Sequence, residues 1–565
     1  MKILKTFWLI ALYTVSCSVF AVKPSGTLPV MYINTSGGQE ITSKETYLDA
    51  EYWLDPMGIE GVEAFGSAAE PLKTQIKGRG NYTWKDFKKK PYRVKLDKKA
   101  ALLGLDKSKH FALMAHADDG YGFLRDALGF KISELMGMPW TPKQEPVELV
   151  LNGDYVGLYF LTENIRVDAD RVDVVEQPDE ATDPAEITGG WLVEIDNYNS
   201  DPHVTVPEKG QSEPYDIWFT YKTPEVLSAE QEDYLTSQMS AINDLVYDSE
   251  TFNCRWASYV DLDILARFYV VQEVMDNRES FHGSCYMYKQ QGDDQKWKFG
   301  PVWDFGCTLS GDKDRFIYQG WCFHQVWIGR MCEFTEFMYF VKNRWVEFYE
   351  NHYYEMLSYI NDFAERIKDA AVSDHERWPE YGHSDEMNRA KKVADIIKGN
   401  CSWLSKQWGG QEPVDPGYEL SAYFVDNTSK PWEKVYAYSW ALNTQPLGPW
   451  PGTKMTPAEV KGKPGWEINF TVPTGTDTSK LMIIFGDGQS GVPQHQTGDL
   501  KFDNGMVYYR DESGLSSVSV ADEPLVFPLR VSTIDGRSFT VSSEAELSSL
   551  RGFYILPNKK LYITR

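Results

Sequence analysis

Lys77-Gly-Arg-Gly-Asn-Tyr-Thr-Trp84 is a glycine-rich turn between two β-prone runs, residues 72–77 and 91–96. Glycines let a backbone approach an anion closely, and the guanidinium of Arg79 can grip a phosphate with two N–H groups. The second run places Lys95 inside a strand, where a half-buried lysine needs an anionic partner such as a carboxylate or a nucleotide phosphate. Most glycine-rich turns are only turns, and a strand lysine that faces solvent needs no partner, so this stretch alone leaves both interpretations open.

Two aspartates farther along the chain extend the pattern. Asp276 ends an apolar run that is expected to be a helix capped by Asp261. Asp304 lies between Trp303 and Phe305 at a strand end, where we expect it to meet a cation or a hydrogen-bond donor. A glycine loop, a strand lysine, an aspartate after a helix and an Asp-Phe-Gly triplet follow one another in the order of the parts of a protein kinase.

Residues 76–176 and 267–311 resemble the spore coat protein H (CotH) kinase family. The matching motifs are Gly78-Arg-Gly-Asn-Tyr-Thr-Trp84, Lys89-Lys-Pro-Tyr-Arg-Val-Lys-Leu-Asp97, Leu124-Arg-Asp126, Gly137-Met-Pro-Trp140, Glu148-Leu-Val-Leu-Asn-Gly153, Gly157-Leu-Tyr159 and Pro301-Val-Trp-Asp304. The resemblance implies an atypical protein-kinase-like fold of two lobes over residues 28–408, and a secreted protein kinase that uses ATP and Mg²⁺.

The same resemblance implies roles for individual residues. Lys95 would hold the nucleotide phosphates, Asp276 would be the catalytic aspartate, and Asp304 would be a magnesium ligand. Arg79 and Asn81 would lie in the loop over the nucleotide. Glu163, at the end of a hairpin, is a candidate for the nucleotide site or for the partner of the lysine.

The chain departs from the family pattern at two metal-binding positions. Ser284 stands where family members usually carry an asparagine that binds magnesium, and Gly306 stands where many have a second aspartate. A phosphotransferase needs oxygen ligands for the metal ions at the β- and γ-phosphates. Both an active kinase and a pseudokinase therefore remain open.

The N-terminal residues 1–21 are typical of a signal peptide, with Lys2 and Lys5 before a short apolar run and small residues before Val22. We expect the mature chain to be exported to the periplasm, the cell surface or the medium, with lipid anchoring at Cys17 as a secondary alternative. No later stretch reaches the roughly 20 apolar residues of a membrane span. The net charge of −25 disfavours nucleic acid as a partner.

Six cysteines follow Cys17, and none forms a Cys-x-x-Cys pair or a zinc-ligand spacing. Disulfides are chemically possible outside the cytoplasm, and six cysteines permit 15 pairings. The alternative is that several are small buried hydrophobic residues.

The remaining patterns predict a β-rich lobe followed by a helical lobe. Residues 147–160 alternate around Asn152-Gly153 and predict a hairpin, and residues 176–216 are expected to be mostly loop. Ser228 and Gln231 form a capping box before a helix. Long helices are expected over residues 335–371 and 385–408, followed by a linker over residues 409–417.

Residues 418–506 carry aromatic side chains on alternate positions of short β-prone runs, which suggests a sandwich. Tyr436, Tyr438 and Trp440 share one strand face, and Trp450 follows in a loop. Flat aromatic surfaces can stack on a sugar ring, although the same residues could fill a small core. The segment resembles family 26 starch-binding modules through Val435-Tyr-Ala-Tyr438, Trp450-Pro-Gly-Thr-Lys-Met455, Ile484-Phe-Gly-Asp-Gly488 and Gln496-Thr497. The resemblance implies an α-glucan platform of Tyr436, Tyr438 and Trp450, with polar contacts from Lys454, Asp487 and Gln496.

The sequence thus predicts an α+β protein: a kinase-like domain, a carbohydrate-binding β-sandwich and a small β segment over residues 527–565. The leading hypothesis is an exported CotH-like kinase that transfers the γ-phosphate of ATP to a protein hydroxyl and binds an α-glucan. The alternative is a non-catalytic surface protein that binds glycans. A glycoside hydrolase that pairs Glu163 with Glu194 has little support. Most of the 19 Trp and 33 Tyr fall in the large domain and are expected to fill its core.

Overall fold

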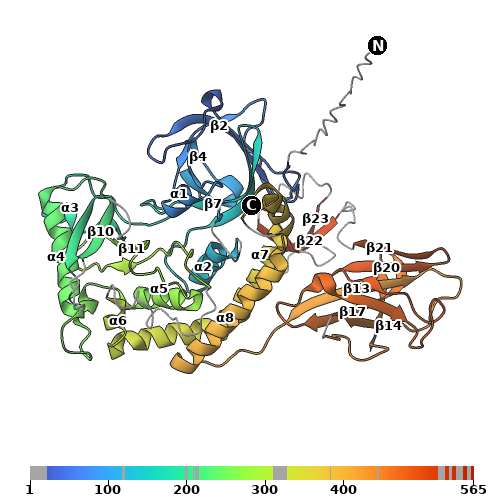
Figure 1. The fold of residues 1–565 in the computed structure, drawn as a ribbon. Helices are drawn as coiled ribbons and strands as arrows, with labels where there is room; N and C mark the ends of the chain where they lie inside the picture. Colours follow the sequence, from blue (N-terminus) through green and yellow to red (C-terminus); the bar gives the residue numbers. More distant parts are fainter. Residues whose placement is uncertain are drawn as a thin grey trace, which may run out of the picture. The chain divides into compact units, whose positions relative to one another are not determined.

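The computed structural model divides into two compact units, Met1–Val414 and Asp415–Arg565 (Figure 1). It describes residues 22–117, 121, 123–196, 201–207, 209, 216–309, 327–381, 384–441, 444–519, 529–533, 538–541, 552–555 and 561–564. The division between the units lies within the segment expected to be a linker. The predicted signal peptide, with Cys17, lies outside the described residues, as does Cys322.

The first unit begins with a closed barrel of seven strands, in the order β1-β2-β3-β4-β5-β7-β6. The strands are β1 (Val30–Thr35), β2 (Leu48–Asp55), β3 (Leu72–Gly78), β4 (Tyr92–Ala100), β5 (Ser108–Met114), β6 (Gln144–Leu151) and β7 (Asp154–Glu163). They confirm the predicted β-runs and the hairpin at Asn152-Gly153. Parallel pairing of β1 with β6, beginning at Val30 and Glu148, closes the barrel, so that no strand edge stays unpaired.

Side chains alternate between the interior and the outer face of this barrel. Along β4, Tyr92, Val94 and Leu96 are buried, whereas Arg93 and Lys95 are exposed. Val94 and Leu96 belong to one apolar cluster that fills the barrel. Because successive side chains of a strand point to opposite faces, the outer face receives the basic residues.

A helical region with a second sheet follows the barrel. Its main helices are α2 (Leu124–Leu135), α4 (Ala229–Val246), α5 (Leu262–Met275), α7 (Thr335–Arg377) and α8 (Glu386–Trp408), and the short ones are α1 (Tyr82–Asp86), α3 (Pro184–Ile187) and α6 (Ile328–Met331). The sheet has the order β12-β11-β8-β10-β9, with β8 (Trp191–Ile195), β9 (His203–Pro207), β10 (Asp216–Thr223), β11 (Cys285–Lys289) and β12 (Lys298–Phe299).

Capping residues and other local sequence patterns predicted most of these helices correctly. The capping box of Ser228 and Gln231 is present with both of its hydrogen bonds, and the Asp261 side chain caps α5. Within residues 176–216, which were expected to be a loop interrupted by a strand over residues 190–195, β8 confirms the strand. The loop prediction was wrong for residues 184–187, which form α3, and for residues 203–207, because β9 pairs with β10 there.

Part of the aromatic load of the first unit is core. Trp191, Trp256, Trp297, Trp327 and Trp345 have no more than 1% of their surface exposed, which confirms the prediction for these residues, whereas others such as Trp140 and Tyr286 are half-buried. Of the cysteines in the described part of the chain, Cys254, Cys285 and Cys401 are buried free thiols. They behave as small hydrophobic residues.

A buried ion pair joins the barrel to α7. Lys89 Nζ lies 2.7 Å from Asp374 Oδ1, and the two side chains are 1% and 2% exposed. Lys89 also donates a hydrogen bond to the carbonyl of Leu158, and the N–H of Leu158 donates to Asp374. A Cβ at Gly157 would lie 2.2 Å from Asp374 Oδ1, so only glycine fits there. Figure 1 shows α7 running from beside α6 to the barrel, and this pair fixes its far end.

The second unit contains a β-sandwich. Its sheets have the orders β16-β17-β13-β20-β21 and β15-β14-β18-β19. The strands are β13 (Tyr418–Asp426), β14 (Tyr436–Trp440), β15 (Thr453–Lys454), β16 (Thr456–Val460), β17 (Lys463–Val472), β18 (Met482–Gly486), β19 (Leu500–Lys501), β20 (Met506–Asp511) and β21 (Gly514–Ser519). Phe424 of one sheet stacks on Phe485 of the other, with ring centroids 4.7 Å apart.

A further sheet lies in the C-terminal segment, with the order β23-β22-β24-β25. Its strands are β22 (Leu529–Thr533), β23 (Ser538–Val541), β24 (Gly552–Ile555) and β25 (Leu561–Thr564). The prediction of a small β segment over residues 527–565 is thereby confirmed. Among the described helices of the chain, none has the length and apolar character needed to cross a bilayer.

The ion pair provides a test of the fold. Replacing Lys89 by Met leaves the buried Asp374 carboxylate without its counter-charge, and should lower the free energy of unfolding of the first unit by about 3–5 kcal/mol. The double variant Lys89→Met/Asp374→Leu should recover most of that loss, because neither charge remains buried. Urea unfolding followed by tryptophan fluorescence measures both.

Lys88→Met is the matched control. Its side chain is 75% exposed and pairs with Glu380 at the surface, so the change should leave the free energy of unfolding close to that of the wild type. Equal losses for the Lys88 and Lys89 variants would contradict a structural role for the buried pair.

Candidate active site

The glycine-rich turn carries Arg79 toward the Asp304 loop. Gly78 ends β3, and a Cβ there would lie 2.4 Å from the ring of Trp84, so glycine is required for this packing. Arg79 Nη1 donates to the sulfur of Met114 at 2.6 Å. The Arg79 guanidinium lies 5.7 Å from the ring centroid of Trp303, the residue before Asp304.

The loop after β12 presents Asp304. Asp304 has a φ of 58° and an exposed side chain, whose Oδ1 accepts a hydrogen bond from the Gly306 N–H at 3.2 Å. The next residue, Phe305, is buried, and its N–H donates to Asp126 Oδ1 of α2 at 3.1 Å. Asp126 therefore holds the loop in the conformation that leaves the Asp304 carboxylate accessible.

Asp276 lies at the C-terminus of α5 and is buried. It too has a left-handed backbone, with a φ of 52°. The side chain of Asn277 donates to Gln272 Oε1 at 2.8 Å and to the Asp304 carbonyl at 3.2 Å. One amide side chain thus binds together the two loops that carry Asp276 and Asp304. Non-glycine residues in left-handed conformations are uncommon and concentrate at functional sites.

The charged and polar groups around Arg79 come from both the barrel and the helical region. Burial and the nearby Arg93 lower the pKa of the Arg79 guanidinium, whereas Asp304, Tyr286 and Asp126 oppose that shift. These neighbours come from β4, β11, α2 and the Asp304 loop. The site therefore places basic groups of the barrel opposite acidic groups of the helical region, an arrangement that suits an anionic ligand bound with a cation.

The aromatic residues of β14 form a candidate site in the second unit. Tyr438 and Trp440 stack with ring centroids 5.4 Å apart and an angle of 23°. Trp450, which is 38% exposed, meets Tyr438 edge-on at 5.6 Å. On the opposite face of the strand, Ala437 and Ser439 are buried. The aromatic face thus lies outside the sandwich core.

The three polar residues predicted for this site have different surroundings. Lys454 is exposed and pairs across strands with Tyr436. Asp487 Oδ2 lies 2.7 Å from His495 Nδ1, and Gln496 Oε1 accepts a hydrogen bond from the Gly491 N–H at 3.3 Å. Their roles in binding sugar remain predictions.

A comparison with protein families settles the relationship of the first unit. The model of the CotH kinase protein family matches residues 76–404, which is more than half of the chain. The chain belongs to the CotH kinase protein family. Asp276, Asp304 and Arg79 all lie within the CotH match. A search of curated proteins found no match.

Two solved structures show a distant likeness. One is the crystal structure of CBMbc (family CBM26) from Eubacterium rectale Amy13K in complex with maltoheptaose, at 20% identity, covering 20% of this chain and 49% of that chain with a TM-score of 0.14. The other is the solution structure of CBM25-2 of the beta/alpha-amylase from Paenibacillus polymyxa, at 21% identity, covering 19% and 95% with a TM-score of 0.14. TM-scores this low do not establish a shared fold.

The other residues expected from the CotH resemblance have partners of their own. Lys95 is exposed on the outer face of the barrel, opposite His110. Asn81 is exposed, and its Oδ1 accepts a hydrogen bond from Lys44 at 2.7 Å. Ser284 has a φ of 48° and directly precedes β11, where the register places it beside Asp196, the residue after β8.

The carboxylate of Glu163 is hydrogen-bonded to the backbone. Its two carboxylate oxygens accept hydrogen bonds from the N–H groups of Asp106 and Lys143 at 2.8 and 3.1 Å. Burial raises the Glu163 pKa, and these bonds oppose the shift. The geometry shows a structural task for Glu163 and no contact with Lys95, so its role in nucleotide binding remains a prediction.

The structure does not support a glycoside hydrolase that pairs Glu163 with Glu194. Glu163 belongs to the barrel, whereas Glu194 belongs to β8 of the other sheet and pairs with Lys222 at 2.9 Å. A glycosidase instead needs two carboxyl groups that flank one bond.

The sequence reasoning missed Asp126, Asn277 and Arg93 as residues of the site. Asp126 and Arg93 lie within motifs that match the CotH family, and Asn277 follows the predicted catalytic aspartate. The signal was therefore available, but the roles depend on contacts between α2, α5 and the Asp304 loop that no local pattern reveals.

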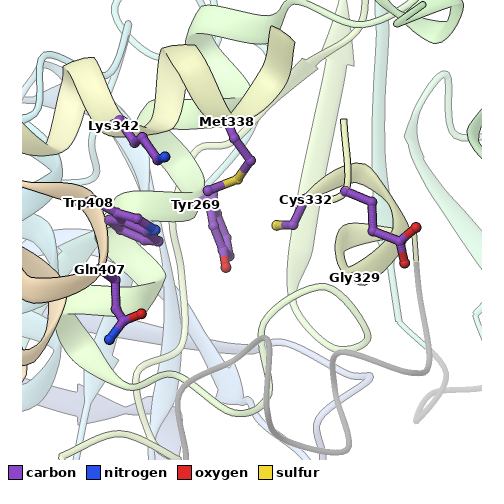
Figure 2. A pocket seen from close by; sticks show the side chains of 8 residues that line it. Tyr269, Gly329, Cys332, Met338, Lys342, Gln407 and Trp408 are labelled. Atoms are coloured by element: carbon purple, nitrogen blue, oxygen red, sulfur yellow. The ribbon is translucent and has the colours of Figure 1, made fainter. Parts of the chain in front are cut away.

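A pocket of about 350 Å³ lies elsewhere in the first unit. Figure 2 shows Tyr269 and Trp408 on one side, with Met338 and Cys332 nearby. None of the residues predicted for catalysis or nucleotide binding lines this pocket.

Gly129 offers a test of how the Asp304 loop is positioned. A Cβ at this position of α2 would lie 2.3 Å from the Phe305 ring. Gly129→Ala should therefore displace Phe305 and lower the free energy of unfolding by about 1–3 kcal/mol, as overpacking does. Thermal unfolding of the full chain measures the effect.

Gly399 in α8 is the matched control, because an added Cβ there meets nothing within 4 Å. Gly399→Ala should raise stability by about 0.5–1 kcal/mol through helix propensity alone. If Gly129→Ala were equally stabilising, Phe305 could not be packed as described.

Proposed function

We propose that this CotH-family chain is an exported phosphotransferase that moves the γ-phosphate of ATP to a protein hydroxyl. The observation that carries the proposal is the hydrogen bond from Asn277 to the Asp304 carbonyl, which holds the Asp276 and Asp304 loops together. Arg79 reaches the same place from the barrel. Aspartates on two joined loops and a basic group above them are the parts that phosphoryl transfer requires.

Each residue has a task in this proposal. Asp276 accepts the proton of the acceptor hydroxyl or orients that hydroxyl. Arg79 and Lys95 bind the phosphate oxygens and offset their charge. The signal-peptide pattern predicted for residues 1–21 supports export, so we propose that the reaction takes place outside the cytoplasm. The rival role is that of a pseudokinase that binds glycans without catalysis.

The residues present fit a magnesium ion. Among the residues that the structure describes, no three His, Cys, Asp or Glu side chains gather to hold a metal. Mg²⁺, however, is commonly held by one or two carboxylates together with substrate phosphates and water, and the exposed Asp304 can supply one. Bound there, the ion would neutralise charge that develops on the phosphate oxygens.

Nucleotide binding tests this proposal. Mg-ATP at 100 times its dissociation constant should stabilise the first unit by about 2.7 kcal/mol. Asp304→Ala should abolish most of that gain, whereas Asp395→Ala, which removes an exposed carboxylate of α8, should retain it. Thermal shift and calorimetric titration measure both. No stabilisation of the wild type, or an equal gain in Asp304→Ala, would refute the nucleotide site.

A second function is favoured by the aromatic face of the second unit. We propose that Tyr436, Tyr438 and Trp450 bind an α-glucan, with Lys454, Asp487 and Gln496 at its edge. The support is the position of these rings outside the sandwich core, where their faces can stack on sugar rings.

Retention on insoluble starch tests this binding. Trp450→Ala should reduce the bound fraction severalfold, because the exposed ring supplies a stacking surface. Tyr509→Ala removes a half-buried aromatic side chain from the other sheet and should bind like the wild type. Equal retention of the wild type and Trp450→Ala would remove Trp450 from the platform.

A further inference from the structure

The outer face of β3, β4 and β5 carries a row of basic side chains. Lys77 pairs across strands with Arg93, and Lys95 pairs with His110. Cross-strand partners point to the same face of a sheet, so these four side chains share the outer face. The row crosses three strands and is therefore about 10 Å wide, which is two strand spacings. Arg93 connects the row to the candidate active site, because it pairs with Lys77, two residues before Arg79, and its charge contributes to the lowered pKa of Arg79.

Two arginines from the segment after β7 extend the row. Arg171 is held by the backbone, because its guanidinium donates to the carbonyls of Asn164 at 2.6 Å and His110 at 3.1 Å. Arg166 is half-buried, and its buried Nε has no hydrogen-bond partner among the described residues. Arg171 therefore serves the fold, whereas Arg166 retains capacity to bind a ligand.

The pKa of His110 reflects its burial and the positive charge of this surface. Burial first, and then Arg166, Lys95, Arg171 and Arg93, lower the pKa of His110 to about 4. The imidazole is therefore neutral near pH 6, because burial and the cationic neighbours both disfavour its charged form. An anion bound among them would remove that disadvantage.

Three acidic groups of this region have other partners, whereas Asp97 is exposed on the same face of β4 and Arg166 acts electrostatically on Asp168. Glu163 accepts two backbone N–H groups, Asp106 lies 3.1 Å from Lys143, and Asp168 lies 3.4 Å from Lys99. These carboxylates do not form an ion pair with Arg93 or Lys95 in the described contacts. The row is thus a cationic surface built on a rigid barrel.

We propose that Arg93, Lys95, His110 and Arg166 form a polyphosphate-binding surface that takes the triphosphate of a nucleotide, with Arg166 as an additional phosphate ligand. The inference rests on the proposed function, which it deepens by naming the residues that hold the phosphate chain. Arg166 and Lys95 donate hydrogen bonds to phosphate oxygens, and these charge-assisted bonds are among the stronger ones in proteins. His110 takes up a proton from solvent as the anion binds, and then donates to it.

The test is calorimetric titration of the full chain with two probes, Mg-ATP and inorganic tripolyphosphate without metal. Arg166→Ala and Lys95→Ala should each weaken both probes about tenfold or more. Lys95 is exposed, so its variant is expected to fold. Arg366→Ala, which removes an arginine of α7 that is 46% exposed, is the control and should bind like the wild type. Adenosine alone should be insensitive to all three changes.

Proton uptake is the second readout. Titrations at pH 6 in two buffers of different ionisation enthalpy should show that the wild type takes up more protons per bound ligand than His110→Gln. The difference isolates His110 from the protons of the ligand itself. Equal uptake by the two proteins would remove His110 from the surface.

The outcomes separate this inference from the proposed function. Binding of Mg-ATP that needs Asp304 but not Arg166 or Lys95 would overturn the inference and leave the phosphotransferase standing. Binding of tripolyphosphate that needs Arg166, without any binding of Mg-ATP, would support the anion surface and overturn the phosphotransferase. If Arg166→Ala and Lys95→Ala both bound tripolyphosphate with the affinity of the wild type, the inference would be overturned.

Discussion

The buried pairing of Lys89 with Asp374 is the constraint on which the candidate active site depends. Burial lowers the pKa of Lys89 and raises that of Asp374, and their mutual attraction opposes both shifts. The cost of burying two charges is offset only while both stay in place with their hydrogen bonds to Leu158. Since α7 also packs against α2 and α5, this pair fixes the barrel relative to the helices that carry Asp126 and Asp276.

The site itself combines rigid support with local strain. Asp276 and Asp304 both have left-handed backbones, which cost roughly 1–3 kcal/mol each for residues other than glycine. Asn277 and Asp126 compensate by binding the loops on either side, through the Asp304 carbonyl and the Phe305 N–H.

Local patterns predicted local structure well. The capping box at Ser228, the hairpin at Asn152-Gly153 and the alternation along β4 each depend on neighbours within a few residues. Closure of the barrel depends on the pairing of Val30 with Glu148, which no short pattern contains. For the same reason the motifs identified Asp276 and Asp304 as candidates but not Asn277 as the link between them, and not the row that joins Arg93 to Arg166.

The central claim is that Asp276 acts on an acceptor hydroxyl next to a bound nucleotide. The most direct measurement is transfer of label from γ-labelled ATP with Mg²⁺ to exported proteins or to the chain itself, compared between the wild type and Asp276→Ala. The account predicts that the wild type incorporates label and that Asp276→Ala loses at least about a hundredfold of the rate, while its affinity for Mg-ATP persists. Equal labelling by the two proteins, or no labelling by a wild type that binds Mg-ATP, would contradict it.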